Sequence, residues 1–230
     1  MSDGLGEMSR YEVKFVAMAT EMPRLCRWIR LHKEGFLMSF PDRTVNNAYF
    51  DSNDYDAYGD SLSGASIRRK LRYRWYGESR VPDCGVLEVK LRRSQFGSKY
   101  LYPVATSPIT DGPNWRSILT SIRRQVPLAA RLLLDYHSFP VLINRYTRQY
   151  FISTDGSLRI TVDTGLSIYD QRYKSLPNTT RKATTPDVLI LECKADQDLH
   201  DRISDAIANL PIRVSRFSKY GTGVTALTDH

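Results

Sequence analysis

Residues 66–76 alternate between basic and largely apolar side chains, and this pattern constrains the fold more than any other stretch of the chain. Alternation with a period of two, rich in tyrosine and tryptophan, predicts a half-buried β-strand. One face of that strand would carry Arg68, Lys70, Arg72 and Arg74, and the other Arg69, Leu71, Tyr73 and Trp75. Like charges about 7 Å apart on one face repel each other. The row is therefore either a solvated outer surface or the lining of a concave surface that binds a polyanion.

The composition fits one large domain with an anionic partner. The chain has 230 residues and a net charge of +8, which suits nucleic acid, a phosphate compound or an acidic membrane without choosing among them. Three cysteines without a CxxC pair indicate a reduced, cytoplasmic setting, and four scattered histidines give little support to a zinc site or a histidine-centred triad. No run of 18 apolar residues predicts a membrane-spanning segment. Residues 1–9 lack a signal-peptide core and are expected to be a flexible N-terminus.

Periodicity and turn residues divide the rest into short strands and a few helices. Helices are expected from Pro23 to Gly35, over residues 114–135 with a break at Pro127, and over residues 201–210. Residues 51–64 and 170–186 are expected to be loops, the first with one helical turn. The predicted strands cover residues 10–18, 45–50, 66–76, 86–92, 97–104, 141–151, 158–163 and 188–195.

A Glu-x-Lys pattern appears in three of these strands, with both charges on one face and apolar residues on the other. The pairs are Glu12 and Lys14, Glu88 and Lys90, and Glu192 and Lys194. A single open sheet would place such faces in water. Closing the strands would instead give a barrel with a charged lumen and helices on its outside. Lysine and arginine there would bind phosphate oxygens, and the carboxylates among them would be explained by a divalent metal that bridges phosphates.

Seven motifs, in order along the chain, resemble the VTC domain. This is the polyphosphate polymerase domain of the vacuolar transporter chaperone complex, in the triphosphate tunnel metalloenzyme superfamily. The resemblance spans about residues 10–224 and leaves residues 225–230 as a tail. The motifs are Tyr11-Glu-Val-Lys14, Tyr49-Phe-Asp51, Arg72-Tyr-Arg-Trp-Tyr76, Leu87-Glu-Val-Lys90, Arg159-Ile-Thr-Val-Asp-Thr164, Leu191-Glu-Cys-Lys194 and Ser215-Arg-Phe-Ser-Lys-Tyr220.

The resemblance implies an α+β fold with a closed antiparallel eight-stranded β-barrel and flanking helices. It implies transfer of the γ-phosphoryl group of ATP to a growing polyphosphate chain, assisted by Mn²⁺ or Mg²⁺. The expected catalytic residues are Lys14, Arg72, Arg74, Lys90, Arg145, Arg159 and Lys219. Further phosphate contacts are expected from Lys70, Lys99, Lys194 and Arg216, of which Lys70 comes from the strand pattern. Glu192 matches the family's metal-binding carboxylate, and the strand pattern adds Glu12 and Glu88 as metal candidates.

Two alternatives remain open at this point. A tunnel triphosphatase would use water in place of the phosphate acceptor, although Glu-x-Lys at Glu12 is shorter than the Glu-x-Glu-x-Lys of the hydrolases and favours the polymerase. A polyphosphate-binding or nucleic-acid-binding module would need no turnover. Nucleic acid is disfavoured because the aromatic residues of the basic strand, apart from Tyr76, lie opposite its cations. Eukaryotic family members carry membrane helices that this sequence lacks, so a membrane partner is left open.

Overall fold

Eight strands form one antiparallel sheet in the computed structural model, which describes residues 11–93, 96–213 and 217–228. The strands are β1 (Tyr11–Met18), β2 (Leu37–Asp51), β3 (Ile67–Tyr76), β4 (Gly85–Arg93), β5 (Phe96–Val104), β6 (Phe139–Ile152), β7 (Arg159–Asp170) and β8 (Val188–Ala195). Their order across the sheet is β1-β8-β7-β6-β2-β3-β4-β5. The eight strands and their antiparallel arrangement confirm the predicted fold class in these respects.

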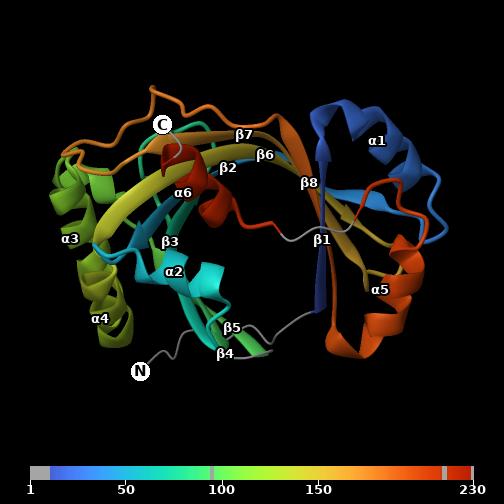
Figure 1. Ribbon diagram of the computed structural model, residues 1–230, viewed down its shortest axis with the longest axis horizontal. Coiled ribbons are helices and arrows are strands. Elements are labelled where there is room, and N and C mark those ends of the chain that lie inside the picture. The colour runs from blue at the N-terminus through green and yellow to red at the C-terminus, as the bar shows by residue number, and fades with distance from the viewer. Residues whose placement is uncertain (1–10, 94–95, 214–216, 229–230) are drawn as a thin grey trace.

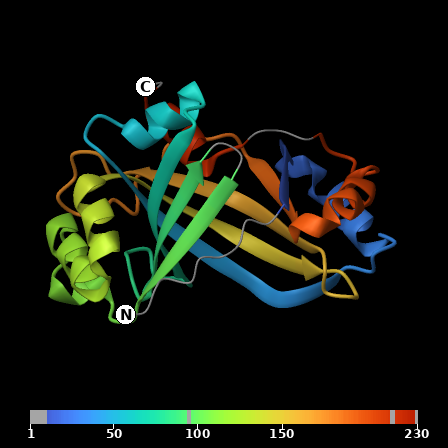
Figure 2. The same cartoon turned by 90° about the horizontal axis from the view of Figure 1, so that it is seen from below.

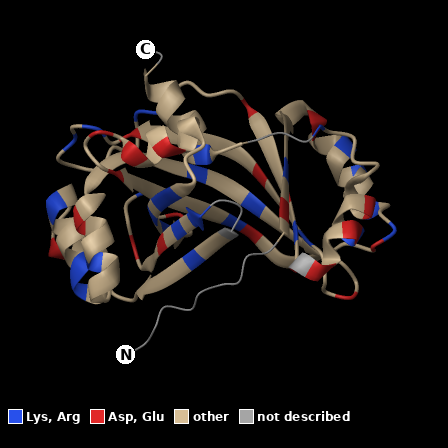
Figure 3. Ribbon diagram, turned by 60° about the horizontal axis from the view of Figure 1, so that its bottom comes forward, with Lys and Arg blue, Asp and Glu red and all other residues tan. Residues whose placement is uncertain are grey.

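The sheet is an open half-barrel, so the predicted closed barrel is wrong for this structure. It arches over a concave face, with β3, β4 and β5 forming one arm and β1 and β8 the other (Figures 1 and 2). Within residues 11–93, 96–213 and 217–228, no backbone pairing joins the two edge strands, β1 and β5. Both arms carry lysine and arginine (Figure 3), and cations of one arm repel those of the other, so bringing the arms together without an anion would cost electrostatic free energy.

Helices cover the outside of both arms. The helices are α1 (Met22–Arg30), α2 (Asp56–Ser63), α3 (Trp115–Gln125), α4 (Leu128–Tyr136), α5 (His200–Ile207) and α6 (Lys219–Thr228), with short 3₁₀ turns at Ala19–Glu21, Pro108–Asp111 and Gln197–Leu199. α3 and α4 cover the β3–β5 arm, where Trp75 and Leu87 share a core with Ile118. α1 and α5 cover the other arm. None of the helices in the described part of the chain is long and apolar enough to cross a membrane.

α6, unlike α1, α3, α4 and α5, lies on the concave face, where its Tyr220 packs against Tyr58 of α2. Its Tyr220 and Val224 share a core with Leu142 of β6 and Ile168 of β7. A Cβ atom on Gly223 would collide with the Leu142 side chain, so glycine allows the helix to approach the sheet. α6 therefore covers one part of the concave face (Figure 1) with apolar contacts.

Several elements extend beyond the sequence-based boundaries. β2 begins at Leu37 instead of residue 45, because residues 37–44 pair with β6 although most of them are exposed. The stretch expected to be a loop at residues 51–64 contains α2, whose first turn donates backbone N–H groups to the Asp51 carboxylate. β7 continues to Asp170, and α6 continues to Thr228, past residue 224 where the domain was expected to end.

Candidate functional site

Two arrays of charged residues lie on the two arms of the half-barrel, on either side of the concave face (Figure 3). Pairing between strands puts each array on one face, because directly paired residues point to the same side of a sheet. The cation wall, on β3, β4 and β5, consists of Arg68, Lys70, Arg72, Arg74, Glu88, Lys90, Arg92 and Lys99. The acid wall consists of Glu12, Lys14, Arg148, Arg159, Asp163, Glu192, Lys194 and Lys219.

Glu88 is the single carboxylate of the cation wall and is almost fully buried. Arg72 donates to its Oε2 from Nε at 2.8 Å and from Nη2 at 2.5 Å. Arg74 Nη1 and Lys99 Nζ lie 3.3 and 3.7 Å from Oε1. Burial raises the pKa of Glu88, but Arg72, Arg74 and Lys99 outweigh burial and bring this pKa down to about 2. Glu88 is therefore an ionised internal counterion that fixes three cations in place.

Polar side chains on β2 and β6 extend this arrangement across the floor of the half-barrel. Arg74 Nε donates to Asn47 Oδ1 at 2.9 Å, and Asn47 Nδ2 donates to Asn144 Oδ1 at 2.8 Å. Both asparagines are fully buried. Because each bond uses a planar group with a fixed direction, the guanidinium of Arg74 is oriented as well as neutralised.

Glu192 is the centre of the acid wall. Lys194 Nζ lies 2.9 Å from its Oε2, and Lys14 Nζ lies 3.2 Å from its Oε1. The same two ammonium groups lie 3.7 and 2.8 Å from the oxygens of Glu12. Burial raises the pKa of Glu192, yet Lys194, Lys219 and Lys14 hold it well below the usual value. Burial lowers the pKa of Lys14, but Glu192 and Glu12 reverse this and raise it.

Asp163 joins β7 to α6 within the same wall. Arg148 donates to it from Nε and Nη2 at 2.6 and 2.7 Å, and Lys219 Nζ lies 2.6 Å from Oδ2. Burial raises the pKa of Asp163, but Lys219 and Arg148 hold it below its ordinary value. The buried Asp163 carboxylate thus holds both Arg148 of β6 and Lys219, the first residue of the C-terminal helix α6.

Tyr146 lies beneath these two cations. The Lys219 ammonium is 4.8 Å from the centre of its ring and the Arg148 guanidinium carbon is 5.4 Å away, which are cation–π distances. Its hydroxyl is buried and has no hydrogen-bond partner among the described residues. A buried hydroxyl without a partner is costly, so a ligand oxygen is a suitable partner for it.

Lys70 and Lys90 form no ion pair with a carboxylate of the described residues. Burial lowers the pKa of Lys90, and Lys14, Arg72 and Lys194 lower it further against the opposing effect of Glu12. Burial also lowers the pKa of Lys70, with added repulsion from Lys90, Lys14 and Arg68. Since Lys14 lies on β1 and the other two on β3 and β4, the walls interact electrostatically although their strands do not pair. An anion between them would relieve this repulsion.

Most of the residues expected from sequence to form the site are brought together. Lys14, Lys194 and Lys219 lie in the acid wall with Glu12 and Glu192. The expected residues that lie in the cation wall are Lys70, Arg72, Arg74, Glu88, Lys90 and Lys99. Glu88 lies among guanidinium groups rather than beside the other two glutamates. Arg159 shares the concave face but is exposed at the end of β7. Arg216 lies outside the described residues.

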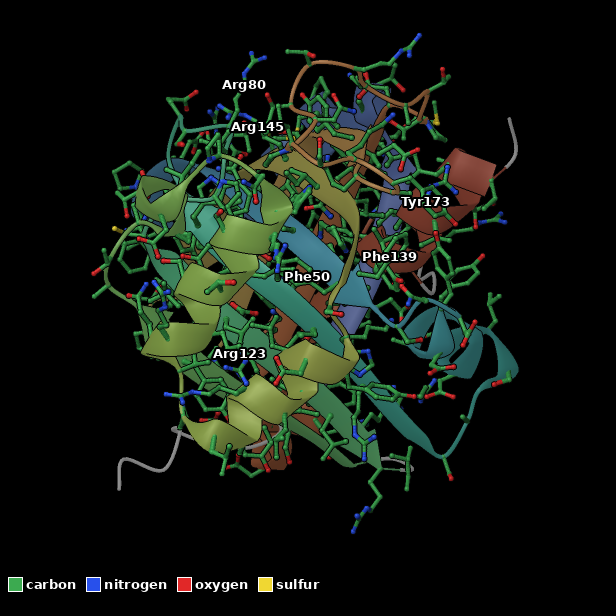
Figure 4. The ribbon with its side chains drawn as sticks, turned by 90° about the vertical axis from the view of Figure 1, so that its left-hand side faces the viewer. Phe50, Arg80, Arg123, Phe139, Arg145 and Tyr173 are labelled. Atoms are coloured by element: carbon green, nitrogen blue, oxygen red, sulfur yellow. The ribbon has the colours of Figure 1, made fainter. Side chains whose placement is uncertain are left out.

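Arg145 is not part of either wall. It pairs with Asn46 on the convex face, donates to the backbone oxygen of Glu78 at 3.0 Å and forms an ion pair with the exposed Glu78 carboxylate. Figure 4 shows it beside Arg80, which also acts on Glu78. The physical reason is that side chains alternate between the two faces of β6, and the even-numbered residues around Arg148 face inward. Arg148 therefore occupies the inward position that was expected for Arg145.

Sequence reasoning missed Arg148, Asp163, Asn47, Asn144 and Tyr146. The signal for Asp163 was present, because it shares a face with Arg159 and Thr161 in the expected strand. The signal for Arg148 was ambiguous, since both faces of residues 141–151 mix apolar and basic side chains.

A divalent metal fits the acid wall better than the cation wall. Lys14 and Lys194 each bridge Glu12 and Glu192, so these carboxylates already share positive charges as they would share a metal ion. Glu88 is saturated by three cations and does not fit. No group of three histidine, cysteine or acidic side chains is positioned for a metal in the part of the chain described here. Ligand phosphate oxygens would therefore have to complete the coordination of a bound ion.

Comparison with known proteins gives a family and a fold. The family model of the VTC domain matches residues 9–228. A plant protein from Hippeastrum, described as a putative adenylyl cyclase with a dominant triphosphatase activity, has 14% identity and a TM-score of 0.54, with 94% of this chain and 96% of that chain covered.

Two further solved structures are more distant. A protein from Pyrococcus horikoshii has 13% identity and a TM-score of 0.46, covering 92% and 97% of the two chains. A putative adenylate cyclase from Vibrio parahaemolyticus has 10% identity and a TM-score of 0.47, covering 93% and 95%. Comparison with curated proteins finds no match.

Proposed function

This chain belongs to the VTC domain family, since the family model covers residues 9–228, and from that premise we propose that it is a metal-dependent polyphosphate polymerase. ATP would bind with its phosphates between the cation wall and the acid wall. A terminal oxygen of the polyphosphate chain would attack the γ-phosphorus and form a new P–O bond. The bond from the γ-phosphorus to the bridging oxygen would break, and its electron pair would leave with ADP. The chain would grow by one phosphate.

The observation that carries this proposal is the extended, partly unbalanced row of cations on β3 and β4. Arg68 to Arg74 span about 20 Å along β3, since a strand rises about 3.3 Å per residue. Six basic side chains lie on this face of β3 and β4, with the Glu88 carboxylate among them. Lys90 forms no ion pair with any described residue, and its pKa is lowered by burial and further by the cations around it. Such a row suits an extended polyanion better than a single phosphate group.

The hydrogen bonds and ion pairs that hold each charged side chain suggest its role in the reaction. Arg72 and Arg74 are oriented by Glu88 and Asn47, so they can donate to phosphate oxygens without reorganising. Arg148 and Lys219 are held by Asp163 and would stabilise the negative charge that spreads over the transferring phosphoryl group. Glu192 and Glu12 would hold Mn²⁺ or Mg²⁺, which when bound supplies positive charge to phosphate oxygens. No titrating base is needed, because phosphate oxygens are already ionised.

A triphosphatase is the alternative, and the Hippeastrum protein supports it through its described activity and shared fold. Water would replace the phosphate acceptor, and the same cations would stabilise the transferring group. A polyphosphate-binding module without turnover is the remaining candidate. These functions differ in their products, although they share the binding surface.

Product analysis separates the three functions. Purified protein is incubated with γ-labelled ATP and Mn²⁺, with Mg²⁺ in a parallel reaction, and the products are resolved by gel electrophoresis and acid precipitation. The polymerase predicts labelled, acid-insoluble chains together with ADP. Orthophosphate as the only labelled product would replace this proposal with the triphosphatase. Unchanged ATP, combined with tight binding of polyphosphate, would indicate the binding module.

A further inference from the structure

Tyr49 places a phenol on the concave face between the two walls. It lies on β2 opposite Arg72 of β3, and its side chain is 6% exposed. Burial raises the pKa of this phenol, but Arg72, Lys219 and Arg74 outweigh burial and lower it. The residues that act on Tyr49 therefore come from both the cation wall and the acid wall.

The hydroxyl of Tyr49 accepts a hydrogen bond but donates none to the described residues. Arg72 Nη1 donates to it at 3.3 Å, and this is its only hydrogen bond among them. A phenol has one proton to donate in addition to its lone pairs. The charged groups that influence the oxygen most strongly are arginine and lysine, which cannot accept that proton. An anionic ligand oxygen is the acceptor that this environment lacks.

The ring of Tyr49 is held in place by a buried network that does not involve the walls. It stacks on Tyr220 of α6, with ring centres 5.2 Å apart and planes 16° from parallel. The Tyr220 hydroxyl donates to Asp51 Oδ2 at 2.5 Å. Asp51 is fully buried and also accepts the backbone N–H groups of Ala57 and Tyr58 at 2.9 and 3.1 Å. The network thus links β2, α2 and α6, and the stacked Tyr220 ring, which does not depend on the Tyr220 hydroxyl, keeps the phenol from turning away.

We propose that the Tyr49 hydroxyl donates a hydrogen bond to a phosphate oxygen of the bound polyanion, beside the Arg72 guanidinium that donates to this hydroxyl. This inference rests on the proposed function, because it requires phosphates between the walls. Tyr49 adds a neutral donor to the charged groups around it. Unlike the lysines and arginines, it can bind a phosphate oxygen without adding repulsion to the unliganded site.

Tyr49→Phe tests this contact because it removes the hydroxyl and retains the stacked ring. The measurement is the Kd for inorganic triphosphate by titration calorimetry, at fixed ionic strength and without metal, together with the melting temperature of the unliganded protein. The expected result is binding weakened about tenfold, the loss typical of one hydrogen bond to a charged group. The melting temperature should change by no more than a few degrees.

Tyr220→Phe is the matched control, because it removes the other hydroxyl of the same stacked pair. It should lower the melting temperature, since buried Asp51 loses a donor, and leave the Kd within about twofold. Equal affinity of Tyr49→Phe and wild type, with wild type binding triphosphate, would overturn the inference and leave the proposed function standing. A large fall in the melting temperature of Tyr49→Phe would also overturn it, because the hydroxyl would then be structural. Failure of wild type to bind would remove the proposed function and this inference together.

Discussion

The carboxylates of the two walls of the half-barrel differ in their ion-pair partners. On the cation wall, Glu88 is outnumbered and forms close contacts with Arg72, Arg74 and Lys99. On the acid wall, Glu12, Glu192 and Asp163 share their cations in a network in which ammonium groups bridge pairs of carboxylates. Glu88 therefore acts as a fixed counterion, whereas Glu12 and Glu192 have partners that another cation could replace.

This difference shows that the same Glu-x-Lys pattern serves two purposes. In both pairs, Glu88 with Lys90 and Glu192 with Lys194, one residue separates the glutamate from the lysine. Lys194 contacts Glu192 at 2.9 Å, whereas Lys90 forms no ion pair with a described residue, because Arg72 from the neighbouring strand occupies Glu88. The neighbouring strand decides which carboxylate remains available to a metal ion.

Glu192→Gln should produce the largest effect and tests the division of roles most directly. If the acid wall holds the metal, metal-dependent turnover of ATP should fall about 10²–10³-fold, while binding of triphosphate without metal should be retained or become tighter. Turnover is measured at several Mn²⁺ concentrations, and circular dichroism checks the fold. The opposite result is that turnover still depends on Mn²⁺ in Glu192→Gln but no longer does so in Glu88→Gln. That result would place the metal on the cation wall instead of the acid wall.

Glu88→Gln should have its main effect on the unliganded fold. Removing this buried charge takes away the carboxylate that holds the Arg72 and Arg74 guanidinium groups and should lower the free energy of unfolding by about 3–5 kcal/mol. Urea denaturation measures the loss, and added triphosphate should restore much of it by binding the same cations. Glu78→Gln, which breaks an exposed ion pair on the convex face, is the control and should change stability little.

The pH dependence of stability follows from the same group. The pKa of Glu88 is about 2 in the folded protein, below the ordinary value of 4.5. Its stabilising contribution should therefore be complete above pH 4.5 and disappear as the pH falls toward 2. Comparing urea midpoints of wild type and Glu88→Gln between pH 6 and pH 2.5 should show the difference shrinking with acid. A constant difference would mean that the charge of Glu88 is not what stabilises the cation wall.

Arg148→Ala and Arg145→Ala compare the concave and convex faces of one strand. Arg148→Ala should weaken triphosphate binding about 10- to 100-fold, because a bidentate donor oriented by Asp163 is lost. Arg145→Ala should leave the Kd within about twofold. Calorimetric titration of both variants under identical salt decides between them. If only the Arg145 variant binds more weakly, Arg145 is the phosphate-binding arginine, as expected from the sequence. The assignment of Arg148 to the inward face of β6 would then be wrong.

The smallest expected effect is proton uptake on binding. The pKa values of Lys70 and Lys90 are lowered from 10.5, so these lysines lose protons at a lower pH in the unliganded protein. A polyanion should raise both values, and binding near pH 9.5 should take up a fraction of a proton. Titrations in two buffers of different ionisation enthalpy measure this uptake. It should decrease in a Lys70→Met, Lys90→Met double variant, and its persistence there would assign the protons to other groups.

Local sequence patterns predicted most of the strands and the opposed faces of the basic one. Arg72 and Arg74 lie on one face and Tyr73 and Trp75 in the core, as period two requires. The pattern did not predict α2 or α6, because short helices with weak periodicity are stabilised by tertiary contacts, such as the Asp51 cap and the packing of Tyr220 on Tyr49.

By itself the sequence determined the strand faces, the excess of positive charge and the family, since these depend on residue order alone. Only the tertiary structure decided that the half-barrel is open, that Arg148 rather than Arg145 faces inward, and that Glu88 and Glu192 have different partners. The physical reason is that each of these outcomes depends on register and on charges from distant strands. An ion pair depends on two positions that can be far apart in the sequence. The cations of residues 66–76 form one side of a site only because β4 and β5 pair beside them and the acid wall lies on the other arm.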